Sequence, residues 1–526
     1  MKSYRLISII LSGLFLFLDS CTDFLNKPPQ TSLTADQVFS SVTDLDPLIV
    51  GLYTKWRNTR VDRGGFYFMM GTDEAKQGFV QVRDDPNQAA LDRYDAFLIP
   101  SNTEITAKWT ERWPIVSSAA QAIQALLKVS DPSDQQKELL GEASFLRAAV
   151  DFELTQYWGA IPIIDYDKID QYGTARQPLG DVYTFIEADL QRAIQYLPET
   201  QSDPRRATKW IAEALLGKLY LYADANSGFR DYQKASDAFL TVINSQRFGL
   251  AASFSTLFDP AQQGSGDYNS EVIYAFQFTN LRGDNNVCQW QMGSRAVAIM
   301  TNPNVLIWYA GYDLMMPTPY CYASVDSGGI WEDGDTRRDE SIRYDFNYTG
   351  SVPAINGGIA QLTGYCGGDE LDPHVKKYED VRTEGWGSSS WYSGKNIAYI
   401  RYADVLLCYA ECQNELGNIT TAMAYVNLVR RRAFGSTTQN WKGLSQDQFR
   451  TMILDERMRE LCFEGWRHMD LVRTGHFVDY VKERNEWANA SGTIDQHNTV
   501  YPIPQSEILQ NSDITVADQN PGYPNQ

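Results

Sequence analysis

Apolar residues recur at helical spacing through the first half of the chain. The stretch DPSDQQKELLGEASFLRAAVDFELTQYWG, residues 131–159, repeats apolar positions with the period of a helix. This pattern predicts a helix that is capped by Asp131 and ended by Gly159. An earlier periodic stretch, residues 103–129, contains Pro114, which we expect to kink or split it because proline cannot donate a backbone hydrogen bond. Helices are therefore expected to dominate the first 250 residues.

Two pairs of consecutive amphipathic stretches predict helical hairpins. The first pair covers residues 208–224 and 231–250, and the second covers residues 400–418 and 419–433. Small residues such as Gly217 at the contact, with aromatic residues behind them, resemble the tetratricopeptide hairpin of ~34 residues. The match is loose, so we describe this scaffold as tetratricopeptide-like.

Residues 251–397 separate the two hairpins and have a different pattern. Gly, Asn, Asp, Ser and Pro are frequent, and the strand-like stretches EVIYAFQF and RYDFNY are short. A long irregular insert in a helical scaffold is where function is usually carried. We therefore predict a mainly α fold, with a helical scaffold over about 34–250 and 398–480 and a loop-rich ligand-binding portion that contains short strands. An extended surface tail is expected over about 490–526.

The N-terminus has the features of a secretory signal. Lys2 and Arg5 give it a positive start, and the apolar stretch LISIILSGLFLFL follows. This stretch is shorter than the ~20 residues of a helix that spans a bilayer, and it is typical of a signal peptide. No later apolar run approaches that length, so any membrane contact of the mature chain must come from an attached lipid.

A single cysteine marks the end of this signal. Small Ser20 precedes Cys21, as in a bacterial lipobox, where the cysteine is lipidated and becomes the first residue of the mature chain, although Asp19 departs from that pattern. We predict a signal peptide over 1–20, lipidation of Cys21 and a proline-containing tether over 21–33. Ordinary secretion with cleavage elsewhere is the alternative.

Charge and aromatic content narrow the class of ligand. The net charge is −20, which argues against nucleic acid as a partner because its phosphates need a positive surface. The chain holds 13 Trp, 30 Tyr and 23 Phe. Such rings suit wet interfaces and can stack on the apolar faces of sugars. Packing between helices is the alternative use of many of these rings.

Five aromatic residues are candidate platforms for a sugar ligand. Trp290 and Trp331 lie in polar, glycine-containing stretches, where a tryptophan has little helix core to fill. Trp391 and Tyr392 lie in the similar stretch GWGSSSWYSGKN, and Phe79 lies in an early polar loop. The alternative for each ring is the small core of the insert itself.

The sequence offers little sign of a metal site, a cofactor or catalysis. It has no C-x-x-C or H-E-x-x-H spacing, and Cys408 and Cys412, four residues apart on one helix face, are expected in the core. The acidic stretch of residues 332–340 lacks the spacing of a calcium loop and fits a salt-bridged turn. Glycoside hydrolysis needs a pair of carboxylates, and the 66 acidic residues offer many pairs, so a secreted glycoside hydrolase stays an alternative.

Four stretches together resemble the SusD/RagB family of surface glycan-binding lipoproteins. They are Gly141–Ile164, Ile400–Asn418, Ile453–Gly475 and Tyr501–Tyr523, in the order of the family. The third contains the charged run DERMRELCFEGWRHMDLVR, in which like charges at helical spacing would repel one another unless other helices bring partners. We therefore expect this charge cluster to bridge helices, and not to catalyse a reaction.

The resemblance implies a function and a location. It implies a single domain over 34–526 that sits at the surface of a Gram-negative outer membrane, caps a TonB-dependent SusC-like transporter, and passes oligosaccharide into it without enzymatic activity. The loop around Phe79 resembles a region that lines the family's ligand site. A peptide-binding protein or a protein scaffold of the same fold remains an alternative, and no cofactor is expected.

Overall fold

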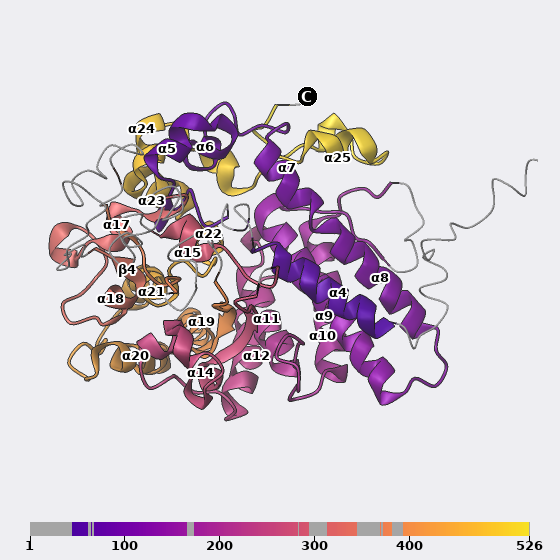
Figure 1. The fold of residues 1–526 in the computed structure, drawn as a ribbon, viewed down its shortest axis with the longest axis horizontal. Coiled ribbons are helices and arrows are strands. Elements are labelled where there is room, and N and C mark those ends of the chain that lie inside the picture. Colours follow the sequence, from indigo (N-terminus) through magenta and orange to yellow (C-terminus); the bar gives the residue numbers. More distant parts are fainter. Residues whose placement is uncertain are drawn as a thin grey trace, which may run out of the picture.

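Helices dominate the protein. A computed structural model describes residues 45–61, 65, 68–165, 173–281, 283–293, 313–344, 369, 372–380 and 393–524. The predicted signal peptide, the tether and Cys21 lie outside these residues. Figure 1 shows a layer of long helices on one side of the molecule, and on the other side further helices mixed with short helices and strands. The predicted mainly α fold is confirmed.

The long helices centre on α9, which is buried from Leu139 to its end. Its cap is Ser133, and not Asp131 as predicted, because the Ser133 hydroxyl and the Gln136 side chain each accept a hydrogen bond from the other residue's backbone N–H. The helix ends at Gly159, as predicted, and Pro114 lies in the first turn of a separate helix. The members of this layer are α4 (Leu45–Asn58), α7 (Thr103–Thr110), α8 (Trp113–Leu127), α9 (Asp134–Trp158) and α10 (Leu179–Tyr196).

The two predicted hairpins are confirmed. The first consists of α11 (Lys209–Tyr222) and α12 (Tyr232–Asn244), and the second of α19 (Tyr402–Glu415) and α20 (Ile419–Phe434). Gly217 faces the Phe239 ring so closely that an added Cβ would lie 2.7 Å from a ring carbon. The small residue at this position therefore allows α11 and α12 to pack together.

The insert between the hairpins forms short elements. The predicted strand over residues 271–278 is β2 (Val272–Phe276), which pairs antiparallel with β6 (Ile397–Arg401). The second predicted strand is described only at its start, as β4 (Ile342–Arg343), which pairs with β5 (His374–Val375). The insert also forms short helices that its turn-rich composition did not predict: α13 (Phe254–Phe258), α14 (Gly266–Glu271), α15 (Cys288–Met292), α17 (Pro319–Tyr322) and α18 (Arg337–Ser341).

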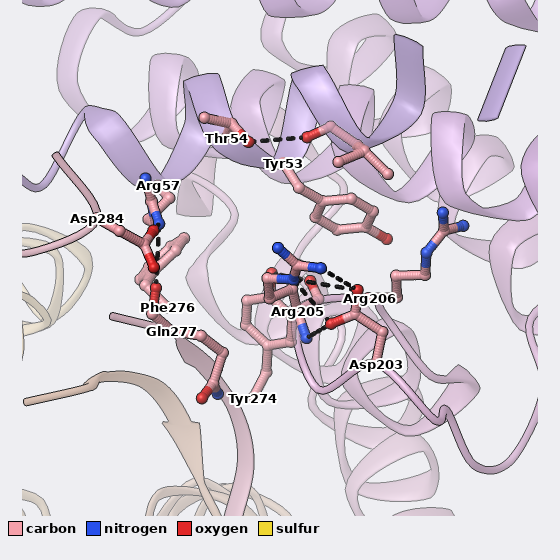
Figure 2. A pocket seen from close by; sticks show the side chains of 11 residues that line it. Tyr53, Thr54, Arg57, Asp203, Arg205, Arg206, Tyr274, Phe276, Gln277 and Asp284 are labelled. Atoms are coloured by element: carbon pink, nitrogen blue, oxygen red, sulfur yellow. Dashed lines mark hydrogen bonds and ion pairs between the residues drawn. The ribbon is translucent and has the colours of Figure 1, made fainter. Parts of the chain in front are cut away.

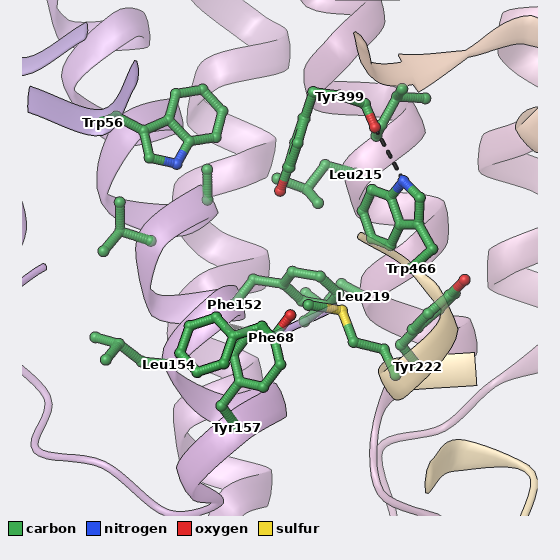
Figure 3. Close-up of a cluster of buried hydrophobic side chains, with 14 of the residues drawn as sticks. Trp56, Phe68, Phe152, Leu154, Tyr157, Leu215, Leu219, Tyr222, Tyr399 and Trp466 are labelled. Atoms are coloured by element: carbon green, nitrogen blue, oxygen red, sulfur yellow. Dashed lines mark hydrogen bonds between the residues drawn. The ribbon is translucent and has the colours of Figure 1, made fainter. Parts of the chain in front are cut away.

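An aromatic core joins the N-terminal layer to the C-terminal part. Figure 3 shows Trp56 of α4, Tyr399 of β6 and Trp466 drawn together. The ring centroid of Tyr399 lies 5.0 Å from that of Trp56 and 5.4 Å from that of Trp466, whose indole N–H donates to the Tyr399 carbonyl. Cys408 and Cys412 are fully buried, as predicted.

The charged family motif bridges helices, as predicted. Glu456 and Glu460 of α21 (Gln446–Leu461) are fully buried, and Arg337 of α18 pairs with both. Burial alone would raise the pKa of Glu456, but the surrounding arginines, Arg430 among them, hold that pKa at about 2. The stretch of residues 332–340 forms ion pairs of its own, as predicted, since Asp335 pairs with Arg337 and Glu332 with Arg430.

The C-terminal tail corrects an expectation. It was predicted to run extended over the surface, but it contains α25 (Gln505–Gln510) and short helical turns at Gln496–Thr499 and Val516–Asp518. Tyr501 and Ile503 are buried in the core. The Asn520 amide donates to the carbonyls of Trp158 and Tyr501, so the tail is fastened to the end of α9.

Candidate functional site

Two short paired strands bring together segments far apart in the sequence. β1 (Ala75–Lys76) pairs antiparallel with β3 (Met316–Pro317). The chain after β1 leads to α5 (Phe79–Asp84) and α6 (Pro86–Arg93), and the chain after β3 leads directly to α17. Three C-terminal helices complete this region, which Figure 1 shows at one end of the molecule: α22 (Arg467–Arg473), α23 (Phe477–Arg484) and α24 (Glu486–Ser491).

Phe79 is the predicted platform that this geometry supports best. Its side chain is 43% exposed, at the first residue of α5. Its ring centroid lies 6.3 Å from that of Trp487 on α24, and the two ring planes are tilted by 41°. The indole N–H of Trp487 donates to the carbonyl of Gln77 at 2.8 Å, which fixes the ring beside Phe79. The two residues form a surface pair of rings from opposite ends of the chain.

A pocket of about 660 Å³ is lined by residues of α24 on either side of Trp487 in the sequence, and we call it the aromatic pocket. Glu486 and Asn489, which flank Trp487 on α24, line one side, and Tyr320 and Tyr322 of α17 line another. Its remaining lining residues are Pro319, Ala323, Ser327, Gly328, Glu483 and Arg484. The volume lies within the range of roughly 300–1,000 Å³ that is usual for small-ligand sites.

Arg484 orders the floor of the aromatic pocket. Its guanidinium carbon lies 3.9 Å from the ring centroid of Tyr320 and 3.6 Å from that of Tyr480, so the cation is held between two rings. The Tyr320 hydroxyl donates to Asp455 at 2.9 Å. Burial, together with the charge of Asp455, raises the pKa of Tyr320 well above its usual range, so the hydroxyl remains a donor. This side of the pocket is therefore rigid before any ligand arrives.

Asn485 fixes the start of α24. It is fully buried, and its side-chain oxygen accepts from the backbone N–H groups of Trp487 and Ala488. Its amide nitrogen donates to the Thr72 carbonyl and to Asp92. Burial raises the pKa of Asp92 to about 6, although several hydrogen bonds to the carboxylate oppose the shift. One buried asparagine thus ties the Trp487 helix to the turn before β1.

Trp331 corrects a prediction. It was a candidate platform, but its side chain is only 1% exposed, and its indole N–H donates to the Cys321 carbonyl at 2.5 Å. At this degree of burial no ring face is open to a sugar. Trp331 is a core residue that is hydrogen-bonded to α17.

The other candidates stay predictions. Trp290 is partly buried on α15, and Trp391 and Tyr392 lie outside the described residues. Sequence reasoning did not single out Trp487, Tyr320 and Tyr322 as site residues. The available signals were a tryptophan inside the polar run ERNEWANASG and two tyrosines in the turn-rich stretch TPYCYAS.

The chemistry of the pocket suits binding. Exposed ring surface at Phe79 can take the apolar face of a sugar, while Glu486, Asn489 and Tyr322 offer donors and acceptors for hydroxyl groups. Among the described helices, none combines the length and the apolar character that a bilayer span requires.

Two family models match the chain. One, described as "SusD family", matches residues 306–523, and the other, described as "Starch-binding associating with outer membrane", matches residues 23–221. SusD-like protein P2 of Formosa agariphila is 28% identical over 567 aligned positions, which cover 99% of this chain and 100% of that protein. The starch-binding protein SusD of Bacteroides thetaiotaomicron is 24% identical over 420 positions, which cover 73% of this chain and 72% of that protein.

Solved structures share this fold. A SusD superfamily protein from Bacteroides vulgatus aligns over 92% of this chain and 100% of its own, with a TM-score of 0.72 and 20% identity. A structure named as a laminarin-binding SusD-like protein aligns over 91% of this chain and 99% of its own, with a TM-score of 0.70 and 23% identity. Since the two family models match separate parts of the chain and SusD-like protein P2 aligns along nearly all of it, the chain belongs to the SusD/RagB family.

Proposed function

We propose that this protein binds oligosaccharide at the cell surface and delivers it to a TonB-dependent SusC-like transporter in the outer membrane. The observation that carries the proposal is the Phe79–Trp487 pair near the aromatic pocket, in which the Phe79 ring is exposed. The names of its relatives, which include a starch-binding and a laminarin-binding protein, support carbohydrate as the ligand class. The lipid on Cys21 would hold the protein beside its transporter.

Binding, without cleavage of a bond, is the proposed action. Stacking on an aromatic ring contributes about 0.5–1.5 kcal/mol beyond area burial if a sugar behaves like a second ring, and each hydrogen bond adds a net of about 1 kcal/mol. Two or three such contacts give affinities near the micromolar range or weaker. Weak binding suits a protein that must release its cargo.

Binding to a glycan array, followed by calorimetry on the glycans found, tests the proposal. Trp487→Ala and Phe79→Ala should each weaken binding by about tenfold, the loss of roughly 1.4 kcal/mol. Leu509→Ala is the matched control, because Leu509 is 77% exposed on α25 and outside the pocket. Unchanged binding in both aromatic variants would refute the site, and binding to peptides in place of glycans would favour the peptide alternative.

Three further measurements address the remaining parts of the proposal. Release of reducing ends from the bound glycan at enzyme-like rates would favour the hydrolase alternative. Mass spectrometry of the mature N-terminus should find a lipidated Cys21, and any other N-terminal residue would refute the anchor. Purification from outer membranes should recover the transporter with the protein, and its absence from a gently solubilised complex would count against delivery.

A further inference from the structure

A second groove lies away from the aromatic pocket. It has a volume of about 400 Å³ and is formed by the residues around α14, by the segment that follows β2, and by the segment that precedes β6. Figure 1 shows α14 at the lower edge of the molecule and α24, which lines the aromatic pocket, at the upper edge. A ligand in this groove would therefore not touch the aromatic pocket.

The wall of the groove is uncharged and rich in carboxamides. Five of its lining residues are Asn or Gln, and none of the residues that line it carries a charge, in a chain that is 21% charged with a net charge of −20. The five are Gln263, Asn269, Gln277, Asn280 and Asn396. Carboxamides both donate and accept hydrogen bonds, which is the pattern that hydroxyl groups need.

Several of these amides are held in fixed orientations. The Asn396 side chain donates to Gln277 at 2.8 Å and accepts from the Phe278 backbone N–H. The Asn280 oxygen accepts from the Gly394 N–H at 2.8 Å, and a Cβ on Gly394 would lie 2.4 Å from that oxygen. Only glycine allows this approach, so the backbone sets the direction of the Asn280 amide.

Gln263 leaves a donor without a partner. Its side-chain nitrogen is buried, and no acceptor among the described residues lies within hydrogen-bond distance. Buried polar atoms of this kind carry a cost of about 1–3 kcal/mol when they stay unpaired. A ligand oxygen in the groove would remove that cost once the Gln263 side chain turns its amide toward the groove.

The groove neighbours the smaller pocket that Figure 2 shows, which has a volume of about 190 Å³. Gln277 lines both, and Asp203 of the smaller pocket precedes Pro204 of the groove. The charged side chains there all have partners: Arg57 pairs with Asp284, Arg205 with Asp203, and Arg206 with Asp46 and Glu142, which lie outside the lining. The smaller pocket therefore does not call for a charged ligand either.

We propose that this groove is a second carbohydrate site, for an uncharged, hydroxyl-rich segment of an oligosaccharide. The carboxamides supply the hydrogen bonds, the exposed Pro204 ring supplies apolar surface, and the volume lies in the usual range for small ligands. The proposal rests on the proposed function for its ligand class, but not on the aromatic pocket for its geometry.

Saturation-transfer NMR on the full mature chain tests this site. The probes are maltohexaose, laminarihexaose, D-glucose, D-galactose and D-xylose, with D-glucuronate as the charged probe. In the double variant Gln263→Ala/Asn280→Ala, the saturation-transfer signal of at least one neutral probe should fall several-fold. The control Gln262→Ala changes an exposed neighbour outside the groove and should give the wild-type signal. Asn280→Asp, which keeps the side-chain shape, is the second variant in case the first does not fold.

The outcomes separate this proposal from the proposed function. The groove site would be overturned if the groove variants gave the same signals as Gln262→Ala while Trp487→Ala lost its signal. That result would leave the aromatic pocket as the binding site. A response to D-glucuronate as strong as to the neutral sugars, lost in the groove variants, would overturn the uncharged ligand class. No signal from any probe on the wild type would overturn both sites.

Discussion

Arg467 of α22 forms a two-pronged ion pair with Asp73, with both N···O distances at 2.7 Å and both side chains buried. Asp73 lies just before β1, and its backbone carbonyl accepts from the Thr318 hydroxyl just after β3. One oxygen of the Asp73 carboxylate also accepts a hydrogen bond from Arg484, which lines the aromatic pocket. One arginine of the family motif thus anchors both strands that carry the candidate site.

Arg467→Met is expected to cost about 3–5 kcal/mol of the free energy of unfolding, because it leaves the Asp73 carboxylate buried with weaker compensation. Arg450→Met is the matched control, since Arg450 pairs with Glu415 at the surface and its loss should cost less than about 1 kcal/mol. Urea denaturation of the two variants provides the comparison. Equal losses in both would mean that burial of the Asp73 pair does not matter.

Trp331→Ala should destabilise the protein by about 3–5 kcal/mol, because it empties a buried site and removes the hydrogen bond to Cys321. The effect on glycan affinity should be indirect and should follow the fraction of folded protein. Urea denaturation and calorimetry on the same sample separate the two effects. A variant with wild-type stability that has lost binding would restore Trp331 as a ligand platform.

Local patterns predicted the helices but not the site. The end of α9 at Gly159 and the Gly217 contact follow from spacing and side-chain size within one or two helices. The Phe79–Trp487 pair joins residues some four hundred positions apart, and it depends on β1–β3 pairing and on the buried Asn485, which no local pattern encodes. Trp331 failed as a prediction because polar neighbours in sequence do not reveal that the ring is buried in the fold.

Gly217→Ala should lower the free energy of unfolding by about 1–3 kcal/mol, because the new methyl group would overlap the Phe239 ring. Gly51→Ala in α4 is the control, since nothing lies within 4 Å of its added Cβ. That change should instead stabilise by about 0.5–1 kcal/mol through helix propensity. Thermal unfolding should therefore move in opposite directions, and parallel shifts would contradict the assigned contact.

The buried imidazole of His468 makes the stability of the protein depend on pH. Its imidazole is buried against Phe477, Tyr157 and Tyr501, and neither ring nitrogen has a hydrogen-bond partner among the described residues. Burial lowers the pKa of His468 to about 3, from a usual value near 6.5. Between these two values the unfolded chain binds the proton and the folded chain does not, so stability falls as the pH drops below about 6.5.

His468→Phe should remove this loss, since phenylalanine fills a similar space and does not titrate. At pH 5, about 1.5 pH units below the usual pKa of histidine, the wild type should have lost about 2 kcal/mol of its free energy of unfolding through His468. Other buried groups, such as Asp92 with its raised pKa, are common to both proteins and cancel in the difference. Urea denaturation at pH 8 and pH 5 should show the variant gaining on the wild type by that amount at the lower pH. A stability difference that stays constant between the two pH values would mean that His468 is protonated in the fold.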